Sequence, residues 1–426
     1  MKIAVRFAHL NFESNFASKC KKEPKLLYSY INNQKICKES IKMMKEPDGT
    51  ITTANESIVN ILNDLFCMVF NTLSDGLLKF PVLDAKISNK FIQFECTRSG
   101  ELCGGWGDRL KGILSTYAIS MIIDRKFTIK MTRDCDLRRI LEPNEINWDH
   151  EQVPLKVKSK QINIGWEFSF YDIFRNDISL FTNNEDTPLI KVKAGIQFAN
   201  VLRENKNLKQ KIESLGYKVN QFHIVHSLHK WYNQLFKLNK ESQKKYEWYL
   251  RRLKPNLRTK LICVQIRTGD PDSAQRRDYY TRKEYWRFID ENFLNSSDSD
   301  KYKIFVTSDY EPIKEEAKSY FPKNEVIYNE NSSFHIDKQG DKECKGLESV
   351  IFDFHMMQNC DIGVISHSGY GLLALLNRPD PFKELYVYSK EHKHQKVTHN
   401  NQASYYSPWK NLTWIKFSKL GDIIFF

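Results

Sequence analysis

The segment 261–270, LICVQIRTGD, constrains the fold of this chain most. Five of its first six residues are apolar, which is typical of a strand buried on both faces in a parallel sheet covered by helices. The apolar run stops at Arg267, and Gly269 permits a sharp turn after it. In open α/β sheets, ligands bind outside the carboxyl ends of the strands, where an arginine can hold a phosphate through two parallel hydrogen bonds. A structural ion pair between Arg267 and Asp270 explains the same residues equally well.

The rest of the second half alternates between strands and helices. The patterns predict strands in YKIFVTSD, EVIYN, DIGVISHSGYG and FKELYVYS, with a helix between each pair. Three strands end in polar residues: Arg267, then Thr307-Ser308-Asp309, then Ser366-His367-Ser368-Gly369. The carboxyl ends of parallel strands lie at one edge of a doubly wound sheet. We therefore expect these residues to converge on a crevice that binds a nucleotide-like ligand.

An α/β unit also opens the first half, at residue 91. FIQFEC predicts a strand, TRSGELCGGWGD a glycine-rich loop, RLKGILSTYAISMII a helix with Asp108 as its N-cap, and KFTIKM a second strand. A strand, loop, helix and strand in this order form a βαβ unit. Gly104, Gly105 and Gly107 allow backbone N–H groups to approach an anion at the helix N-terminus, although many tight turns also use glycine.

The remaining segments are less regular. Residues 57–78 predict an amphipathic helix, 137–148 a short helix that ends at a proline, and 198–254 a mostly helical region. The stretch 151–191 reads as irregular, with short aromatic runs. Pro255 marks the junction before the 261–270 strand, and we place a domain boundary there.

Length and charge limit the partners of this chain. At 426 residues it is long enough for two domains. Its formal net charge of +13 suits an anionic partner, but the lysines are scattered and no nucleic-acid-binding motif occurs, so we expect no nucleic-acid partner. No apolar run reaches the ~18 residues that span a bilayer, and the N-terminus lacks the apolar core of a secretory signal. We expect a cytoplasmic or otherwise soluble protein, or one in the secretory lumen if the N-terminus is truncated.

Nine cysteines are an odd number and show no tight framework. Cys263 and Cys360 lie in apolar runs, where we expect them to pack as small apolar residues.

Five of these motifs, in this order, resemble the GDP-fucose-using fucosyltransferases of the GT-B fold: the α1,6, α1,2 and protein O-fucosyltransferase group. The motifs are CGGWGDRLKGI, VQIRTGD, VTSD, the acidic residue of IFDFHMMQNCD, and ISHSGYG. They span roughly residues 91–390. The family usually carries H-x-R-R where this chain has Gln265 and Thr268 around the single Arg267. Because of this difference from the family motif, the subfamily and the sugar that is transferred stay open.

The resemblance implies an α/β, GT-B-like architecture of two Rossmann-like domains facing a cleft, with a helical N-terminal appendage. We place the appendage at 1–88, the acceptor-side domain at 89–255 and the donor-side domain at 256–426. The implied partners are a nucleotide sugar and a glycan or glycoprotein acceptor. The implied activity is inverting transfer of L-fucose from GDP-fucose to a hydroxyl group, with no metal and no other cofactor.

The resemblance also implies roles for individual residues. Arg267 would hold the β-phosphate and stabilise the leaving GDP, and Asp270 is the favoured general base among several nearby aspartates. The donor would be bound by the following residues: Gly104, Gly105, Gly107, Asp309, Asp353, Ser366, His367, Ser368 and Gly369. Of these, Asp309 would contact the nucleoside, and Asp353 would contact the guanine or order the serine-rich turn.

Other interpretations of the sequence stay open. Another nucleotide sugar, such as a xylosyl donor, would fit the same fold, and a non-catalytic glycan- or nucleic-acid-binding protein could have the same composition. Two D-x-D patterns, at 134–136 and 298–300, match a metal-binding motif but also arise by chance. His223, His226 and His229 lie three residues apart on a predicted helix, and we interpret them as packed side chains, since no fourth zinc ligand is evident.

Overall fold

The computed structural model describes the following residues: 44–45, 51–52, 90–97, 103–133, 135–269, 282–295, 301–330, 336, 344–366, 368–390 and 412–417. The chain divides into two compact units, Met1–Ile87 and Ser88–Phe426. In the first unit only β1 (Met44–Lys45) and β2 (Ile51–Thr52) are described, and they pair antiparallel. The helix predicted at 57–78 lies outside the described residues, and the domain boundaries at 88 and 255 stay predictions.

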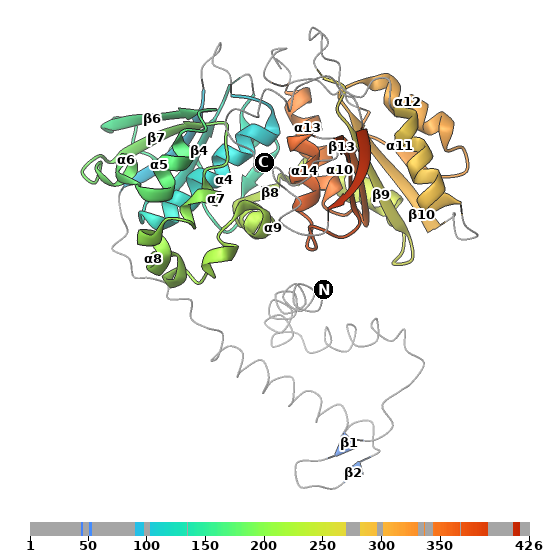
Figure 1. Ribbon diagram of the computed structural model, residues 1–426, viewed down its shortest axis with the longest axis horizontal. Helices are drawn as coiled ribbons and strands as arrows, with labels where there is room; N and C mark the ends of the chain where they lie inside the picture. The colour runs from blue at the N-terminus through green and yellow to red at the C-terminus, as the bar shows by residue number, and fades with distance from the viewer. Residues whose placement is uncertain are drawn as a thin grey trace. The chain divides into compact units, whose positions relative to one another are not determined.

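The first half of the second unit is built on a four-stranded parallel sheet (Figure 1). Its strands lie in the order β4-β3-β7-β6, with bounds β3 (Phe91–Cys96), β4 (Lys126–Met131), β6 (Ser159–Gly165) and β7 (Leu189–Ala194). Helix α4 (Trp106–Ile122) connects β3 to β4, as predicted. Alternate residues of β3, such as Ile92 and Phe94, are buried in a common core with α4.

Shorter elements complete this half. They are η1 (Leu137–Arg139), β5 (Leu141–Pro143), η2 (His150–Gln152), α5 (Phe170–Asn176), α6 (Ser179–Thr182), α7 (Ala199–Leu202), η3 (Lys206–Leu208), α8 (Lys209–Ser214), η4 (Val219–Gln221), α9 (Ile224–Leu235), β8 (Phe236–Leu238) and α10 (Lys240–Leu253). The helical reading of 198–254 is confirmed, with β8 between two helices. The short helix predicted before Pro143 is wrong: one 3-10 turn leads into β5, which ends at Pro143 and pairs antiparallel with β8.

The stretch 151–191 was expected to be irregular, and this expectation is wrong. It contains β6, α5, α6 and the start of β7. In β6, SKQINIG, only Ile162 and Ile164 are buried, because the strand lies at the edge of its sheet. One short apolar alternation among polar residues gives a weak strand signal.

The second half is built on a six-stranded sheet in the order β11-β10-β9-β12-β13-β14. The bounds are β9 (Lys260–Ile266), β10 (Tyr302–Ser308), β11 (Val326–Ile327), β12 (Ile362–Ser366), β13 (Leu385–Lys390) and β14 (Leu412–Phe417). All neighbouring strands are parallel except β13 and β14, and β14 had no counterpart in the sequence prediction. The direction in which strands are added reverses between β9 and β12. Doubly wound sheets bind their ligands at such a reversal point.

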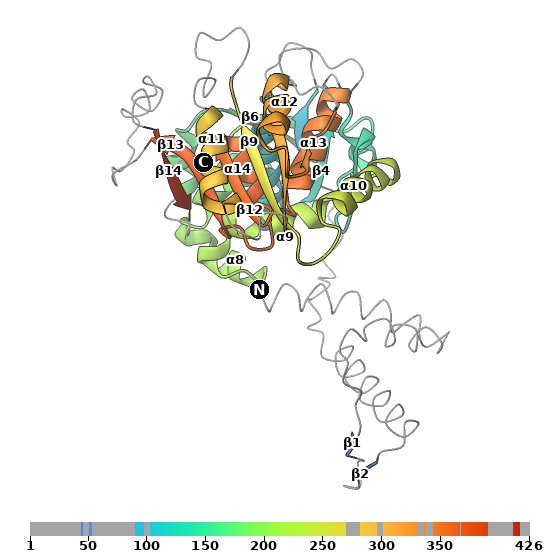
Figure 2. The same ribbon diagram turned by 90° about the vertical axis from the view of Figure 1, so that its right-hand side faces the viewer.

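Helices cover both faces of this sheet (Figure 2). They are α11 (Arg282–Ile289), which continues into the π-helical turn η5 (Asp290–Leu294), α12 (Glu311–Tyr320), α13 (Lys345–Met357) and α14 (Gly369–Leu376). Ile262 and Val264 of β9 share a core with α11 and α12, whereas Leu261 and Cys263 share one with α13 and α14. Burial of β9 on both faces is the arrangement that LICVQI predicts.

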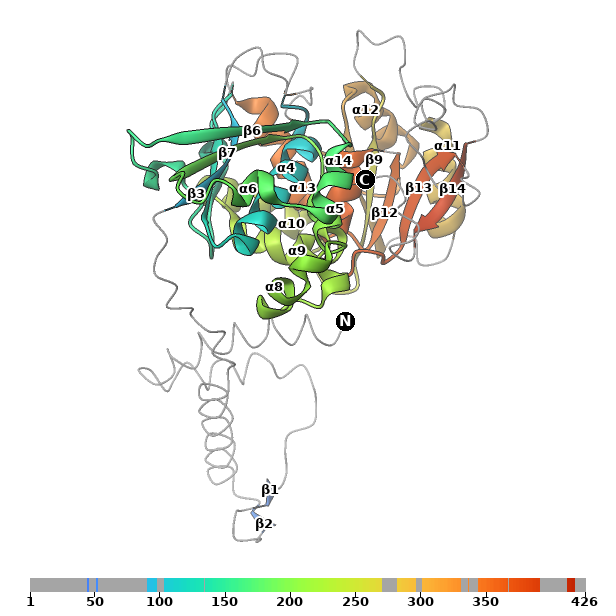
Figure 3. The same ribbon diagram turned by 60° about the vertical axis from the view of Figure 1, so that its left-hand side comes forward.

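Helices α4, α9, α13 and α14 lie between the two sheets (Figure 3), and their aromatic side chains pack together. Phe354 of α13 makes ring contacts with Trp106 of α4 at 6.3 Å and with Tyr232 of α9 at 5.2 Å between centroids. The ring of Tyr370 of α14 lies 6.0 Å from the same phenylalanine. The separate sheets and their shared interface confirm the predicted α/β fold class with two Rossmann-like halves. No helix among the described residues is long and apolar enough to cross a membrane.

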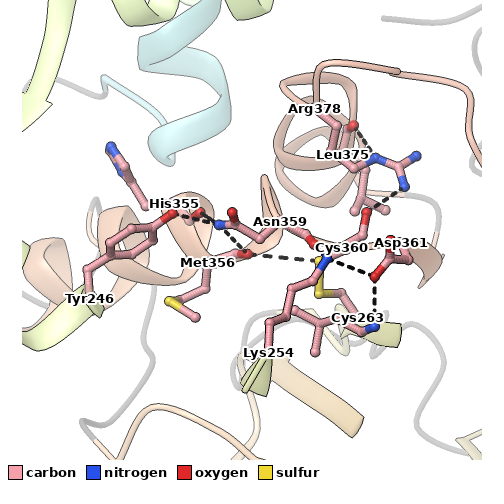
Figure 4. Close-up of a disulfide and its surroundings, with 11 residues drawn as sticks. Tyr246, Lys254, Cys263, His355, Met356, Asn359, Cys360, Asp361, Leu375 and Arg378 are labelled. Atoms are coloured by element: carbon pink, nitrogen blue, oxygen red, sulfur yellow. Dashed lines mark hydrogen bonds and ion pairs between the residues drawn. A yellow bond between two sulfur atoms is a disulfide. The ribbon is translucent and has the colours of Figure 1, made fainter. Parts of the chain in front are cut away.

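Three disulfides occur among the described residues: Cys96–Cys103, Cys135–Cys344 and Cys263–Cys360. The expectation that Cys263 and Cys360 only pack is therefore wrong. Figure 4 shows that this pair joins β9 to the segment before β12, next to Asp361, whose carboxylate accepts hydrogen bonds from Lys254 and from the N–H of Leu261. Sequence spacing gave no signal, because the partners of the last two pairs are 209 and 97 residues apart.

The disulfides predict a limit on free thiols. Six of the nine cysteines are paired, so 9 − 6 = 3 is the largest number of free thiols expected in the unreduced protein. Titration with a thiol reagent in denaturant should give three or fewer before reduction and nine after it. More than three free thiols in freshly purified, unreduced protein would contradict the pairing.

Candidate functional site

The reversal point between β9 and β12 is held together by the residues that end these strands. The backbone N–H of Arg267 donates to Ser366 Oγ at 2.9 Å, and this hydroxyl lies 3.4 Å from Gln265 Oε1. A methyl group at Gly371 would overlap the Gln265 amide, so α14 packs closely on the end of β9. The predicted convergence of Arg267 and Ser366 is therefore present, and the side chain of Gln265 packs against Ser366.

Asp309 binds the turn that follows β9. Its carboxylate accepts hydrogen bonds from Arg267 Nη1 at 2.7 Å, from the N–H and hydroxyl of Thr268 at 2.7 and 3.1 Å, and from the N–H of Gly269 at 3.0 Å. Gly269 adopts a φ of +100°, which a residue with a side chain rarely adopts. The acidic residue of VTSD thus fixes the shape of the arginine turn. The ion pair considered for Arg267 is made by Asp309; Asp270 lies outside the described residues.

The glycine-rich loop enters α4 through a glycine with a positive φ angle. Gly104 has a φ of +77°, and the side chain of Asp108 lies where its Cβ would be. Arg109 is 1% exposed and donates from Nε to the carbonyl of Gly104 at 2.9 Å. The prediction that Asp108 is the N-cap is wrong: Gly105 is the N-cap and α4 begins at Trp106, because the glycines themselves continue into the first turn. Arg109 was missed by the sequence analysis, since a helical arginine is normally exposed.

Two helix N-termini meet beside this loop. A Cβ on Gly107, in the first turn of α4, would lie 3.2 Å from the backbone nitrogen of Tyr370, in the first turn of α14. Ser368 is the N-cap of α14, which begins at Gly369, three residues before the predicted helix LLALLNR. Helix N-termini carry unpaired N–H groups and a partial positive charge. The carboxyl edges of both sheets therefore contribute such groups at one place.

Asp353 of α13 is buried on the other side of the reversal point. Its side chain is 1% exposed, Oδ2 accepts a hydrogen bond from Thr307 Oγ1 at 2.7 Å, and Oδ1 has no hydrogen-bond partner among the described residues. Burial raises the pKa of Asp353 to about 6, although the Thr307 hydroxyl and the charge of Lys314 oppose the shift. A carboxylate with one unused oxygen is costly to bury unless a ligand supplies a donor.

The structure thus brings most of the predicted residues to one edge, namely Gly104, Gly105, Gly107, Arg267, Asp309, Ser366, Ser368 and Gly369. Asp353 reaches the neighbouring strand β10 through Thr307. His367 lies outside the described residues.

The three histidines do not form a metal site: within the described part of the chain, no group of three or more His, Cys, Asp or Glu side chains is placed to hold an ion. His223 caps α9 by accepting from the N–H of Val225, and His229 is bound to the carbonyl of Asn377. Burial lowers the pKa of His223 to about 3, so this side chain is neutral. Asp134, Asp298 and Asp300 lie outside the described residues.

Known structures share this architecture, although no family model and no curated protein sequence matches the chain. A mutant of FUT1 from Arabidopsis thaliana, solved in complex with GDP, is 13% identical, with a TM-score of 0.51 over 75% of this chain and 74% of that one. This chain shares the FUT1 fold. NodZ α-1,6-fucosyltransferase from Bradyrhizobium, soaked with GDP-fucose, is 12% identical over 77% of this chain and 99% of that one, with a TM-score of 0.45. The apo form of POFUT1 is 11% identical over 68% and 94%, with a TM-score of 0.36. The GT-B-like fold predicted from the motifs is confirmed by the FUT1 comparison.

We predict that Asp309→Asn destabilises the protein by about 2 kcal/mol, because charge-assisted hydrogen bonds to a shielded carboxylate are lost. Urea unfolding of the variant and the parent measures this difference. Glu325→Gln is the matched control: Glu325 pairs with Arg252 and Lys303 but is 35% exposed, against 12% for Asp309. The control should cost less than about 1 kcal/mol. Equal losses in the two variants would contradict the role given to Asp309.

Proposed function

We propose that this protein is a glycosyltransferase that transfers L-fucose from GDP-fucose, with inversion and without a metal, to a hydroxyl group of a glycan or glycoprotein. The observation that carries this proposal is the meeting of Arg267, Ser366 and the N-termini of α4 and α14 at the reversal point of the second sheet. Hydroxyls, backbone N–H groups and a guanidinium together suit a pyrophosphate. FUT1, whose fold this chain shares, was solved with GDP.

In this proposal the pyrophosphate binds at the N-terminus of α14. Ser368 supplies a hydroxyl, Gly369 supplies an N–H group, and Gly107 brings the first half close to the same place. Ser366 is buried and positions the backbone of Arg267. Arg267 contacts the β-phosphate, as the motif resemblance implies. A guanidinium carries five N–H donors and keeps its charge, so its bond to Asp309 fixes its direction without neutralising its ability to bind an anion.

The buried carboxylate of Asp353 suits the base of the donor. Guanine presents two neighbouring N–H donors, whereas uracil presents one N–H between two carbonyl groups. A carboxylate can accept from both guanine donors, and because Asp353 is buried next to Thr307 and Asn329, this contact requires a local rearrangement that exposes it. We therefore assign Asp353 to guanine recognition and Asp309 to holding Arg267, in place of a nucleoside contact.

The chemistry follows from this arrangement. Breaking the bond between the sugar and the phosphate leaves negative charge on GDP, and a fixed guanidinium stabilises that charge in the transition state. The acceptor hydroxyl attacks the opposite face of the sugar and needs a base, for which Asp270 stays our candidate. Gln265, where the family usually has a basic residue, packs against Ser366 and Gly371, which favours testing other GDP-sugars as alternative donors.

The disulfides favour an oxidising compartment for this activity. All six paired cysteines are buried or partly buried, and such pairs are rare in reducing cytosol. We therefore propose the secretory lumen, the alternative that the sequence left open, over the cytoplasm.

A panel of nucleotides tests the donor. GDP and GDP-fucose at millimolar concentration should raise the melting temperature, whereas UDP and CMP should not, because only guanine offers the paired N–H donors. The shift and the transfer rate should survive EDTA, since Arg267 takes the place of a metal. Stabilisation by UDP alone, or loss of transfer in EDTA that Mn²⁺ restores, would contradict the donor or the metal-free mechanism.

The pH dependence of GDP binding tests the role proposed for Asp353. Binding requires the ionised carboxylate, so affinity should weaken about tenfold for each pH unit below about 6. Asp353→Asn should bind GDP weakly, and its affinity should no longer change through titration of residue 353. Any pH dependence that remains in this variant comes from titration of the GDP phosphate. The same variant should be more stable than the parent at neutral pH, because a raised folded-state pKa favours the protonated form.

In this proposal Arg267 accelerates the transfer of the sugar. Arg267→Ala should lower the transfer rate by roughly 10²–10³, and Arg267→Lys should also be impaired because the fork of N–H groups is lost. Rates are compared below the melting temperature of each variant, since Arg267→Ala also leaves Asp309 unpaired. Arg287→Ala is the control, because Arg287 is 61% exposed and pairs only within its own helix region. Near-normal turnover by folded Arg267→Ala would remove this role.

A further inference from the structure

Two aromatic side chains are exposed just after β6. Trp166 directly follows the strand and is 42% exposed, and Phe168 is 38% exposed. The ring of Phe168 is supported by Tyr171 at 5.5 Å between centroids. Packing within the protein leaves both rings partly exposed to solvent, and exposed aromatic surface of this kind is typical of a binding site.

Trp166 lies at the same edge of the first sheet as the glycine-rich loop. β6 is parallel to β7 and β7 is parallel to β3, so all three carboxyl ends point the same way. One strand, β7, separates β6 from β3, which places the end of β6 roughly 10 Å along the edge from the end of β3. The loop after β3 leads into Gly107, which meets α14 of the donor-side half. Figure 3 shows β6 at the edge of this sheet, next to β7.

The backbone holds the indole in place. A Cβ on Gly195, directly after β7, would lie 2.5 Å from Nε1 and Cε2 of Trp166, so the ring covers this glycine. The N–H of Gly195 donates to the carbonyl of Gly165 at 2.8 Å, and the N–H of Glu167 donates to the carbonyl of Ile164 at 3.1 Å. One side of the indole rests on backbone, and the remaining surface is turned outward. A ring fixed in this way binds without losing side-chain freedom.

We propose that Trp166 and Phe168, which we name the Trp166 platform, form the acceptor subsite and stack against the apolar face of a pyranose ring in the acceptor glycan. The inference rests on the proposed function, because it takes the other side of the donor site as the place of the acceptor. An aromatic face suits the C–H groups of a sugar ring, and the indole N–H and the exposed Glu167 carboxylate suit its hydroxyls. The spacing from the glycine-rich loop is one that a short oligosaccharide spans.

A second exposed tryptophan shows the contrast. Trp248 of α10 is 49% exposed, but its ring is covered by the guanidinium of Arg252 at 4.8 Å, so its contacts have a structural explanation. Trp248 therefore serves as the matched control, since it is at least as exposed as Trp166 and lies on α10, away from the end of β6.

The test uses the full chain saturated with GDP and titrated with oligosaccharides of glucose, galactose and N-acetylglucosamine, followed by calorimetry. Trp166→Ala should weaken binding of the best oligosaccharide at least about tenfold, and Trp166→Phe should retain part of the affinity. Gly195→Ala keeps the indole but places a methyl group where it rests, so it should weaken binding as well. In transfer assays the KM for the acceptor should rise while the KM for the nucleotide sugar stays unchanged.

Several outcomes would overturn the platform. They are unchanged oligosaccharide binding in folded Trp166→Ala, an equal loss in Trp248→Ala, or no binding of any pyranose oligosaccharide to the parent at millimolar concentration. Each outcome leaves the GDP-induced rise in melting temperature unaffected, so failure of the platform is distinguishable from failure of the proposed donor. Conversely, a protein that binds oligosaccharide through Trp166 but ignores GDP would retain the subsite and lose the proposed reaction.

Discussion

The close approach of α4 to two other backbones determines how the two halves meet. A methyl group at Gly112 would overlap the carbonyl oxygen of Ala194, and one at Gly107 would lie 3.2 Å from the backbone of Tyr370. The first contact places α4 directly on β7, and the second places its N-terminus against α14. Because packed interiors cannot absorb an added methyl without a shift, these two glycines fix the separation of the sheets at the site. The aromatic contacts of Trp106, Tyr232 and Phe354 then fill the space behind it.

The site contains two aspartates, Asp309 and Asp353, whose charges are stabilised to different degrees. Arg267 and Asp309 neutralise each other near the surface, and the remaining capacity of the carboxylate is used by Thr268 and Gly269, so this pair is well solvated by the protein. Asp353 is buried, and burial raises its pKa, which favours the protonated form. The first arrangement fixes the direction of the Arg267 guanidinium. The second lowers the stability of the folded chain at neutral pH, where this carboxyl group must ionise.

Most of the second half and the first βαβ unit could be predicted from sequence, because a buried parallel strand such as LICVQI gives an apolar run that ends sharply, and FIQFEC is rich in apolar residues before a glycine-rich loop. β6 and β14 were missed, since an edge strand needs only a few buried residues and an antiparallel last strand gives no motif. Of the site, Arg267, Ser366 and the glycines were predictable from strand ends. The function of Asp309 was not, because its partners are about 40 residues away and depend on the pairing of β9 with β10.

Two of the disulfides lie next to the candidate site, and the third joins β9 to the segment before β12. Cys96 ends β3 and is bonded to Cys103, directly before the glycine loop, so residues 97–102 form a short closed ring. Cys135 follows β4 and is bonded to Cys344, the N-cap of α13, which carries Asp353 in the other half. A disulfide reduces the entropy of the unfolded chain by an amount that grows with the logarithm of the loop length, so the second bond, which closes the longer loop, is the stronger stabiliser. In the folded chain, both restrain segments that the sheets do not hold: the glycine loop and the start of α13. The positions of the glycine loop and of the start of α13 therefore depend on these two bonds.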